Sequence, residues 1–300
     1  MKIQNFTIVI SFFCIWMTTY FSQQIQVISA FLLIITFGIL HGSNDIVLLN
    51  KIKETNFFIS PAKLLFSYIL VVLSTVLLFY YIPAFALIVF ITISAFHFGE
   101  QHWNKKLMHL NSFFKIIYQL VYGFFILFLL FNFQLNEVIK VVYEISAVTI
   151  STTVLFTVFV FFSIILLLLS TYLYIKGTSF KTLILLEGFY ILVFAIIFKM
   201  TTLIWGFAIY FIFWHSIPSL IDQVNFLYGN WNKKNFILYC KSAFWYWIIS
   251  IAGIFLLYFT LGEKRLFEGL FFSFLAAVTF PHVIVIITMN NQKLNKKLNR

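Results

Sequence analysis

The sequence predicts an all-α, polytopic integral membrane protein, a helical bundle of about ten transmembrane helices forming a single transmembrane domain over residues 1–300. Of the 300 residues, 62% are hydrophobic and only 10% are charged, whereas soluble domains carry about 25% charged residues. The apolar residues also fall into runs close to the roughly 20 residues that a helix needs to cross a bilayer. The net charge of +11 comes largely from lysines that flank these runs, so it does not indicate nucleic-acid binding.

The apolar runs follow one another with short joints. The first two are separated by Ser22-Gln23-Gln24, and the third and fourth only by Pro83, whose ring ends a helix because it clashes with the preceding turn. Such joints predict antiparallel neighbours. The segment 136–146 is too short to span and is interpreted as an interfacial piece. The expected helices cover residues 5–21, 25–42, 64–82, 84–99, 113–133, 148–175, 182–199, 202–221, 243–261 and 266–289.

The basic residues predict the orientation of these helices. Ten spans place both termini on the same side of the membrane. If that side is the cytoplasm, only four of the 20 lysines and arginines lie outside, and the other 16 lie in inside segments. The four outside residues are Lys140, Lys199, Lys264 and Arg265. This asymmetry is the one that positive-inside topology produces, so we expect a multi-pass protein of the cell (inner) membrane with cytoplasmic termini.

Four of the six histidines lie at a similar depth of four expected helices. Each is about 13 to 16 residues from the outer end of its helix, or roughly 20–24 Å at 1.5 Å per residue. They therefore share one layer toward the cytoplasmic side of a hydrocarbon core about 30 Å thick. These histidines are His41, His97, His215 and His282.

Four imidazoles in one layer predict a metal site, because imidazole is the commonest side-chain ligand of iron, copper and zinc. Together they would hold one divalent ion with positions left open for oxygen. The competing interpretation is that each histidine only hydrogen-bonds to a neighbouring helix. Polar groups at this depth are expensive, which makes them candidates for function.

Carboxylates follow three of the histidines. Asp45 comes four residues after His41, on the same face of a helix. The other two are Glu100, three residues after His97, and Asp222, seven residues after His215. These acids either accept the second imidazole N–H of a ligand, which fixes its tautomer, or pair with lysines of the inside loops.

Two further polar residues are placed less clearly. Glu187 lies in the expected helix 182–199, near its inner end, and lines a substrate path or serves packing. His102 comes five residues after His97, which puts it about 140° away around a helix. His102 therefore ranks below the other four histidines as a metal ligand.

Four short motifs at helix ends occur in a recognisable order. They are His41-Gly42-Ser43-Asn44-Asp45, His97-Phe98-Gly99 with Trp103, Trp214-His215-Ser216 and Pro281-His282. The set resembles the Brp/Blh family of bacterial and archaeal membrane β-carotene 15,15′-dioxygenases. The resemblance implies a multi-span protein that holds non-haem Fe²⁺ through histidines and splits β-carotene, or a related carotenoid, with O₂ into two retinals. It also implies that His41, His97 and His215 are iron ligands and the catalytic residues.

The chain departs from the family pattern at Ser219, where the family carries a second histidine four residues after the one that matches His215. A hydroxyl is a poor ligand for ferrous iron. Either His282 completes the site, or the site keeps three ligands, or the chain is a divergent relative with altered activity. His102 is the other histidine available to complete the site, and the family carries an acid or another polar residue at that position.

The composition suits a carotenoid, a long apolar rod that resides in the bilayer. The 21% of aromatic residues, 42 of them Phe, can line a tunnel that opens to lipid, or simply face lipid. The expected partners are a carotenoid, O₂ and the bilayer, with no nucleic acid and an oligomeric state that the sequence does not predict.

Other function classes stay open. Paired histidines would sandwich a haem, although haem pairs usually stack at two depths. The layer would otherwise serve a metal or proton-coupled transporter, whose sites lie nearer the midplane. A retinal-binding photoreceptor needs a lysine within a span, and only Lys199, at an outer helix end, comes close.

Overall fold

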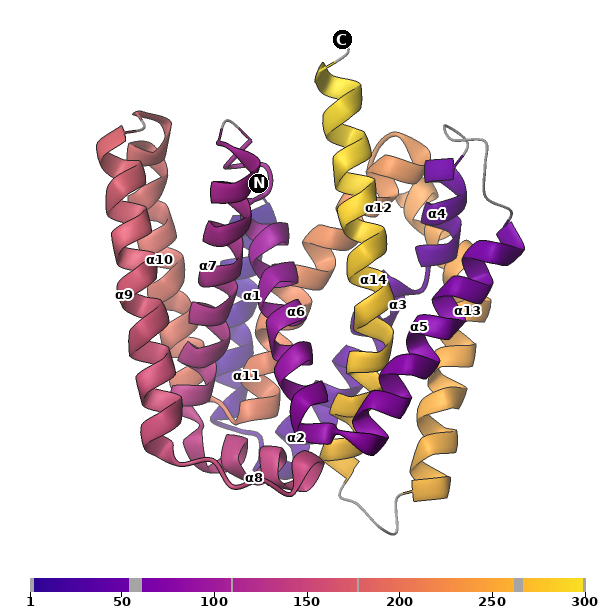
Figure 1. The fold of residues 1–300 in the computed structure, drawn as a ribbon, viewed down its shortest axis with the longest axis horizontal. Coiled ribbons are helices and arrows are strands. Elements are labelled where there is room, and N and C mark those ends of the chain that lie inside the picture. Colours follow the sequence, from indigo (N-terminus) through magenta and orange to yellow (C-terminus); the bar gives the residue numbers. More distant parts are fainter. Residues whose placement is uncertain (1–2, 54–60, 109, 177, 262–266, 299–300) are drawn as a thin grey trace. The chain divides into compact units, whose positions relative to one another are not determined.

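The computed structural model describes residues 3–53, 61–108, 110–176, 178–261 and 267–298. Within these residues all regular structure is helical (Figure 1), which confirms the all-α class. The elements are α1 (Ile3–Thr18), α2 (Gln23–Leu33), η1 (Ile34–Gly38), α3 (Ile39–Gly42), α4 (Asp45–Lys53), α5 (Pro61–Tyr81), α6 (Pro83–Trp103), α7 (Ser112–Phe133), α8 (Leu135–Ser146), α9 (Thr152–Lys176), α10 (Thr178–Met200), α11 (Leu203–Ile209), η2 (Tyr210–Ser216), α12 (Ile217–Tyr228), α13 (Lys233–Leu261) and α14 (Phe267–Leu298).

Eight helical stretches among the described residues are long and apolar enough to cross a membrane. They are Gln23–Ile52, Pro83–Trp103, Ser112–Phe133, Thr152–Lys176, Phe180–Met200, Leu203–Tyr228, Lys233–Leu256 and Ser273–Lys293. Two shorter apolar helices, Gln4–Thr18 and Leu65–Tyr81, fall where the sequence predicts the first and third spans. The chain therefore fits a multi-pass membrane protein with eight candidate spans, and the count of about ten stays a prediction.

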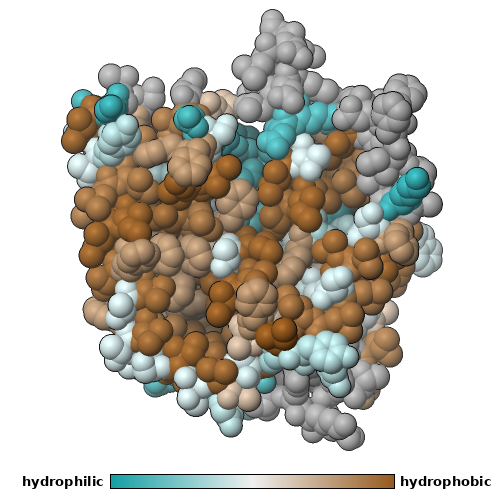
Figure 2. Space-filling model, in the orientation of Figure 1, coloured by the Kyte–Doolittle hydropathy of each residue, from teal (hydrophilic) through white to brown (hydrophobic). Residues whose placement is uncertain are grey.

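The surface agrees with contact to lipid. Apolar side chains cover most of the face shown in Figure 2. Large hydrophobic residues that stand exposed on the long helices include Leu167 on α9 and Leu185 and Leu192 on α10. Exposed residues of this kind are costly in water and favourable in hydrocarbon, so the helices need a bilayer around them.

Several helices are longer than the apolar runs alone predict, and three of them show this clearly. α6 continues to Trp103, so that Glu100 and His102 are helical. α12 continues to Tyr228 and ends at Gly229, whose φ of 92° lies in the left-handed region that glycine adopts without strain. α13 begins at Lys233, well before the expected residue 243. The predicted interfacial piece 136–146 corresponds to the separate helix α8.

The chain groups into two compact units. Unit 1 comprises Met1–Ile34, Ile91–Tyr143 and Val148–His215, and unit 2 comprises Ile35–Phe90, Glu144–Ala147 and Ser216–Arg300. Each unit is built from segments that are far apart in the sequence. The single domain expected from the sequence stays a prediction.

In unit 1, α7 packs against α9 and α10, and α2 packs against α11 (Figure 1). Two glycines allow a close helix contact. A Cβ on Gly99 would lie 1.8 Å from the carbonyl oxygen of Gln119, and one on Gly123 would lie 1.6 Å from that of Ala95. The backbones of α6 and α7 therefore touch at both glycines, as small residues allow between membrane helices.

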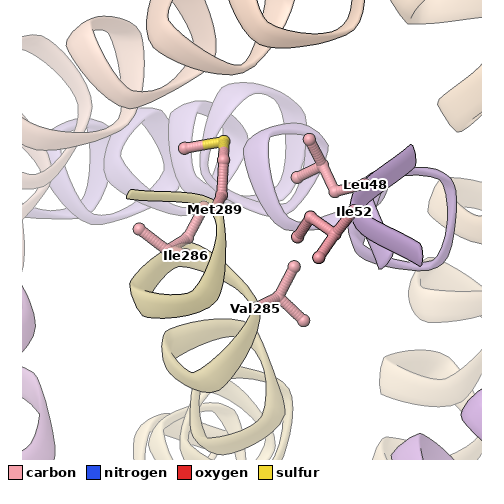
Figure 3. Close-up of a cluster of buried hydrophobic side chains, with 5 residues drawn as sticks. All are labelled: Leu48, Ile52, Val285, Ile286 and Met289. Carbon is pink, nitrogen blue, oxygen red and sulfur yellow. The ribbon is translucent and has the colours of Figure 1, made fainter. Parts of the chain in front are cut away.

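In unit 2, α14 packs along α5 and against α4 (Figure 1). A cluster of buried apolar side chains joins α4 to α14 (Figure 3), and its members are Leu48, Ile52, Val285, Ile286 and Met289. A second cluster, formed by Leu220, Val224 and Tyr239, joins α12 to α13. These contacts fix the positions of α3, α12 and α14, which carry the polar residues described next.

Candidate metal centre

Two π-helical segments lie at two of the predicted histidines. η1 ends at Gly38, three residues before His41, and η2 contains His215. A π-turn widens the helix and changes which carbonyls find a partner in the next turn, and such turns occur frequently at functional sites. In η1 the carbonyl of Ile35 accepts a hydrogen bond from Trp247 Nε1 at 2.9 Å, and that of Gly38 contacts the ring of His41.

In unit 2, His41 on α3 and His282 on α14 form a buried pair. Their ring centroids are 4.8 Å apart with the planes at 88°, and the residues are only 5% and 3% exposed. Pro281 stands inside α14 directly before His282, where it removes a helical hydrogen bond. The structure therefore brings together two histidines that are 241 residues apart in the sequence.

The hydrogen bonds of this pair define its tautomers. Nδ1 of His41 contacts the carbonyl oxygen of Gly38, and Nδ1 of His282 lies 2.8 Å from Oδ1 of Asp45. Carbonyl and carboxylate oxygens accept hydrogen bonds, so these contacts favour the tautomer with the proton on Nδ1 and the lone pair on Nε2. Both rings thus have Nε2 as the atom able to bind a metal ion.

In unit 1, His97 on α6 and His215 in η2 form the second buried pair. Their ring centroids are 4.5 Å apart with the planes at 73°, and they are 2% and 1% exposed. The ring centroid of Phe98 lies 4.8 Å from that of His215, and the ring of Phe211 stacks on the His215 ring with centroids 5.6 Å apart. Aromatic rings around an imidazole give it an apolar, water-poor environment.

Helix α1 holds η2 in place within unit 1. Trp214 Nε1 donates a hydrogen bond to Ser11 Oγ at 3.0 Å, and Thr7 Oγ1 donates to the carbonyl oxygen of Phe213 at 3.4 Å. On α1, Ser11 thus accepts a hydrogen bond from the residue directly before His215, and Thr7 donates one to the backbone of the residue before that. The tryptophan and histidine of the Trp214-His215-Ser216 motif consequently have different tasks: one anchors the segment, and the other lies in the histidine pair.

A model of the beta-carotene 15,15′-dioxygenase family matches residues 32–290. The match covers most of the chain and includes all four histidines. The chain belongs to the beta-carotene 15,15′-dioxygenase family. This confirms the resemblance that the four sequence motifs carry. No curated protein and no solved structure matches the chain.

The donor atoms present suit the metal that this dioxygenase family implies. Non-haem iron in oxygenases is bound by nitrogen and oxygen donors that leave positions open, and imidazole nitrogen is one of them. In unit 2 both rings have their Nδ1 proton held by an oxygen, which is the arrangement in which a ligand histidine is usually found. Each histidine pair therefore offers donor atoms that suit iron.

Ser219, where the resemblance implies a histidine, takes part in a hydrogen-bond network. Ser219 is 1% exposed, and its Oγ accepts a hydrogen bond from Gln223 Nε2 at 3.2 Å. The same amide nitrogen donates to the carbonyl oxygen of His41 at 2.8 Å, and Tyr239 donates to Gln223 Oε1 at 2.8 Å. Ser219 thus belongs to a buried network that supports the backbone of His41.

Asp45 has a partner that the spacing to His41 did not predict. It holds His282 through Oδ1, while Tyr68 donates to Oδ2 at 3.1 Å. The physical reason is local: α3 ends at Gly42 and α4 begins at Asp45. The rule that residues four apart share a face holds only within one continuous helix, and the turn between α3 and α4 points Asp45 toward α14 and α5.

Glu100 and Asp222 each have a lysine neighbour outside the histidine pairs. Glu100 lies close enough to Lys115 for their charges to interact. The backbone carbonyl of Asp222 accepts a hydrogen bond from Lys293 at 2.9 Å. A role of either acid beside His97 or His215 stays a prediction.

His102 and Glu187 lie together in a separate charged cluster of unit 1. His102 Nε2 is 2.6 Å from Glu187 Oε2, and Lys106 Nζ is 2.5 Å from Glu187 Oε1 and 2.8 Å from His102 Nε2. Burial lowers the pKa of the Lys106 amine, and the Glu187 carboxylate offsets part of that effect. The cluster joins the end of α6 to α10, which agrees with the packing role that was one of the two alternatives for Glu187.

Sequence reasoning missed three residues of the polar framework. Gln223 is four residues after Ser219, and this spacing on one helix is a usable signal. Tyr68 and Tyr239 gave no signal, because a tyrosine within an apolar run usually has its hydroxyl at a place that only the tertiary structure defines. All three hold a group that belongs to, or touches, the pair His41 and His282.

Proposed function

We propose that the chain is a non-haem iron dioxygenase that cleaves β-carotene, or a related carotenoid, with O₂ at the central double bond to give retinal. The observation that carries the proposal is the family match over residues 32–290. The two buried histidine pairs support it, because they supply the donors that the chemistry requires. The coarser conclusion, a carotenoid dioxygenase-like membrane protein, follows from family membership and the apolar helices alone.

In this proposal His41, His97, His215 and His282 hold one Fe²⁺, and His41, His97 and His215 are the catalytic residues. These residues would hold the iron, and when bound it would supply the open coordination positions that O₂ chemistry requires. His41 and His282 contribute Nε2, since the Gly38 carbonyl and the Asp45 carboxylate hold their Nδ1 protons. Their burial keeps water away from the site, which protects reactive oxygen chemistry from side reactions.

The substrate side of the proposal rests on apolar aromatic contacts. Phe98 and Phe211 lie against His215 in unit 1, so an apolar polyene near that histidine meets rings rather than polar groups. A carotenoid dissolves in the bilayer that surrounds the helices, and it reaches the protein from lipid. The partners are therefore the carotenoid, O₂ and the bilayer.

The test is expression in a bacterial host that makes β-carotene, followed by pigment extraction. Cells with the intact chain are expected to lose β-carotene and accumulate retinal, and cells with His41→Ala to keep their carotene. Gly188→Ala serves as the matched control, because a Cβ there meets no atom within 4 Å, so this variant behaves like the intact chain. Unchanged β-carotene in cells that contain the intact protein in their membranes would remove the proposal.

A specific observation also favours a second candidate, a family member with altered activity. Ser219 stands where the family carries a histidine, and it is bonded to Gln223. In our main proposal His282 takes the place of that ligand. In the alternative, the iron site has one histidine ligand fewer than in our main proposal, and the reaction it catalyses is different.

Ser219→His is expected to lower stability without raising iron content. The position is almost fully buried, so the larger imidazole must displace Gln223, and overpacking of this kind costs about 1–3 kcal/mol. Thermal unfolding and metal analysis of the purified variant measure both effects, with Ser219→Ala as the variant that removes the hydroxyl without adding bulk. Tighter iron and more retinal in Ser219→His would favour the altered-activity alternative instead.

We further propose that the protein resides in the cell membrane with both termini in the cytoplasm. The asymmetry of 16 inside to four outside basic residues supports this orientation. A reporter fused after Arg300 is expected to read as cytoplasmic and one inserted near Lys264 as periplasmic; both positions lie outside the described residues. The reverse pattern at the two positions would mean that the orientation, or the number of spans, is different.

A further inference from the structure

Asp45 is a buried carboxylate with two hydrogen-bond donors from two other helices. It is the first residue of α4 and is 1% exposed. His282 of α14 occupies Oδ1 at 2.8 Å, and Tyr68 of α5 occupies Oδ2 at 3.1 Å. All three helices pack against one another in unit 2. A carboxylate at this depth is expensive unless such donors compensate it, so the arrangement is specific.

The two histidines of unit 2 have their tautomers fixed in different ways. The proton on Nδ1 of His41 is held by the carbonyl of Gly38, which is backbone of the same helical stretch. The proton on Nδ1 of His282 is held by the Asp45 side chain. Only the second arrangement can be removed by a substitution, and its removal leaves the His282 ring free to rotate and to change tautomer.

We propose that Asp45 and Tyr68 are positioning residues that fix the tautomer and ring orientation of His282, so that His282 serves as the iron ligand that the family places at the position of Ser219. The proposal rests on the proposed function. Asp45 holds the Nδ1 proton, and Tyr68 holds the second carboxylate oxygen and stops the carboxylate from turning away. Ser219 and Gln223 meanwhile support the backbone of His41, so a histidine at position 219 has no place in this chain.

The experiment measures binding of Co²⁺ to the purified full-length chain after removal of its metal. The dissociation constant comes from competition with a chromophoric chelator, and the visible absorption of bound Co²⁺ reports the ligand set. Asp45→Asn keeps the shape of the side chain and is expected to weaken binding roughly 10- to 100-fold, as loss of a carboxylate behind a ligand histidine does. Tyr68→Phe removes only one hydrogen bond, so a loss of roughly fivefold is expected.

Two controls separate positioning from a general loss of structure. Tyr80→Phe changes an exposed tyrosine of the same helix α5 and should leave binding unchanged. In a His282→Ala background, Asp45→Asn should weaken Co²⁺ binding no further, because Asp45 acts through His282. A purely structural role of Asp45 would instead give losses that add.

The outcomes distinguish this inference from the proposed function. If His282→Ala weakens Co²⁺ binding while Asp45→Asn and Tyr68→Phe bind Co²⁺ like the unchanged protein, Asp45 and Tyr68 do not position His282. The proposed iron site is then still supported. Additive losses in the His282→Ala background lead to the same conclusion. If the unchanged protein binds no Co²⁺, both the proposed iron site and the positioning role are wrong. The same conclusion follows if the His282→Ala and His41→Ala variants bind Co²⁺ as tightly as the unchanged protein.

Discussion

His97→Ala is expected to reduce the iron content of the purified protein from about one ion per chain to nearly none, and His41→Ala is expected to do the same. Each substitution removes one imidazole from a buried pair and leaves the other ring of that pair without its neighbour. A site with one nitrogen donor fewer holds ferrous iron much more weakly. Elemental analysis of protein purified from iron-supplied cells measures the change.

His102→Gln is the matched control for His97→Ala. It removes another histidine of the same helix α6, but one that is only half-buried and whose Nε2 contacts Glu187 and Lys106. We expect this variant to keep its iron. Its thermal stability is expected to drop, because the substitution disturbs an ion cluster. Full iron in both His97→Ala and His41→Ala would contradict the proposed site, and equal loss in His102→Gln would mean that His102 is a ligand as well.

Gly99→Ala is expected to cause a large loss of stability. The added Cβ would lie 1.8 Å from the backbone carbonyl oxygen of Gln119, and backbone cannot move aside as a side chain can. α6 and α7 must therefore separate. The expected loss of stability is at or above the upper end of the range of about 1–3 kcal/mol that overpacking costs. Thermal unfolding in detergent, and the yield of folded protein, measure the effect.

Gly188→Ala is the comparison for this prediction, because Gly188 lies in α10 with nothing within 4 Å of an added Cβ. There the substitution should be neutral or stabilising, since alanine is the better helix former by about 1 kcal/mol. Gly99→Ala should also reduce iron content, because Gly99 is two residues after His97 and sets the distance between α6 and α7. A Gly99→Ala protein as stable as the Gly188→Ala protein would show that the two helices are not in backbone contact.

The course of the helices could be predicted from the sequence because composition alone dictates it. A run of apolar residues in a bilayer must be helical to satisfy its backbone hydrogen bonds, so the expected ranges overlap the observed helices, although the ends of several helices differ. What composition could not predict is the local geometry within those runs. The π-helical segments η1 and η2, at His41 and His215, depend on tertiary contacts such as the bond from Trp247 to Ile35.

The candidate site could be predicted in part for a similar reason. The four histidines stand out, because polar residues are rare in such helices. Their partners do not stand out, since each is defined by a contact between distant segments. Asp45 shows this best: its spacing predicts a role beside His41, but the break between α3 and α4 directs it to His282 and Tyr68. Glu187 likewise finds Lys106 and His102 only in the folded chain.

Turnover of β-carotene by the purified, iron-loaded protein in lipid nanodiscs tests the central claim most directly. With O₂ present, we predict that each β-carotene consumed yields two molecules of retinal, measured by liquid chromatography, and that removal of iron or of O₂ stops the reaction. Iron-loaded protein that leaves β-carotene intact would contradict the claim that the chain is a carotenoid-cleaving dioxygenase. Aldehydes of unequal length would contradict cleavage at the central double bond.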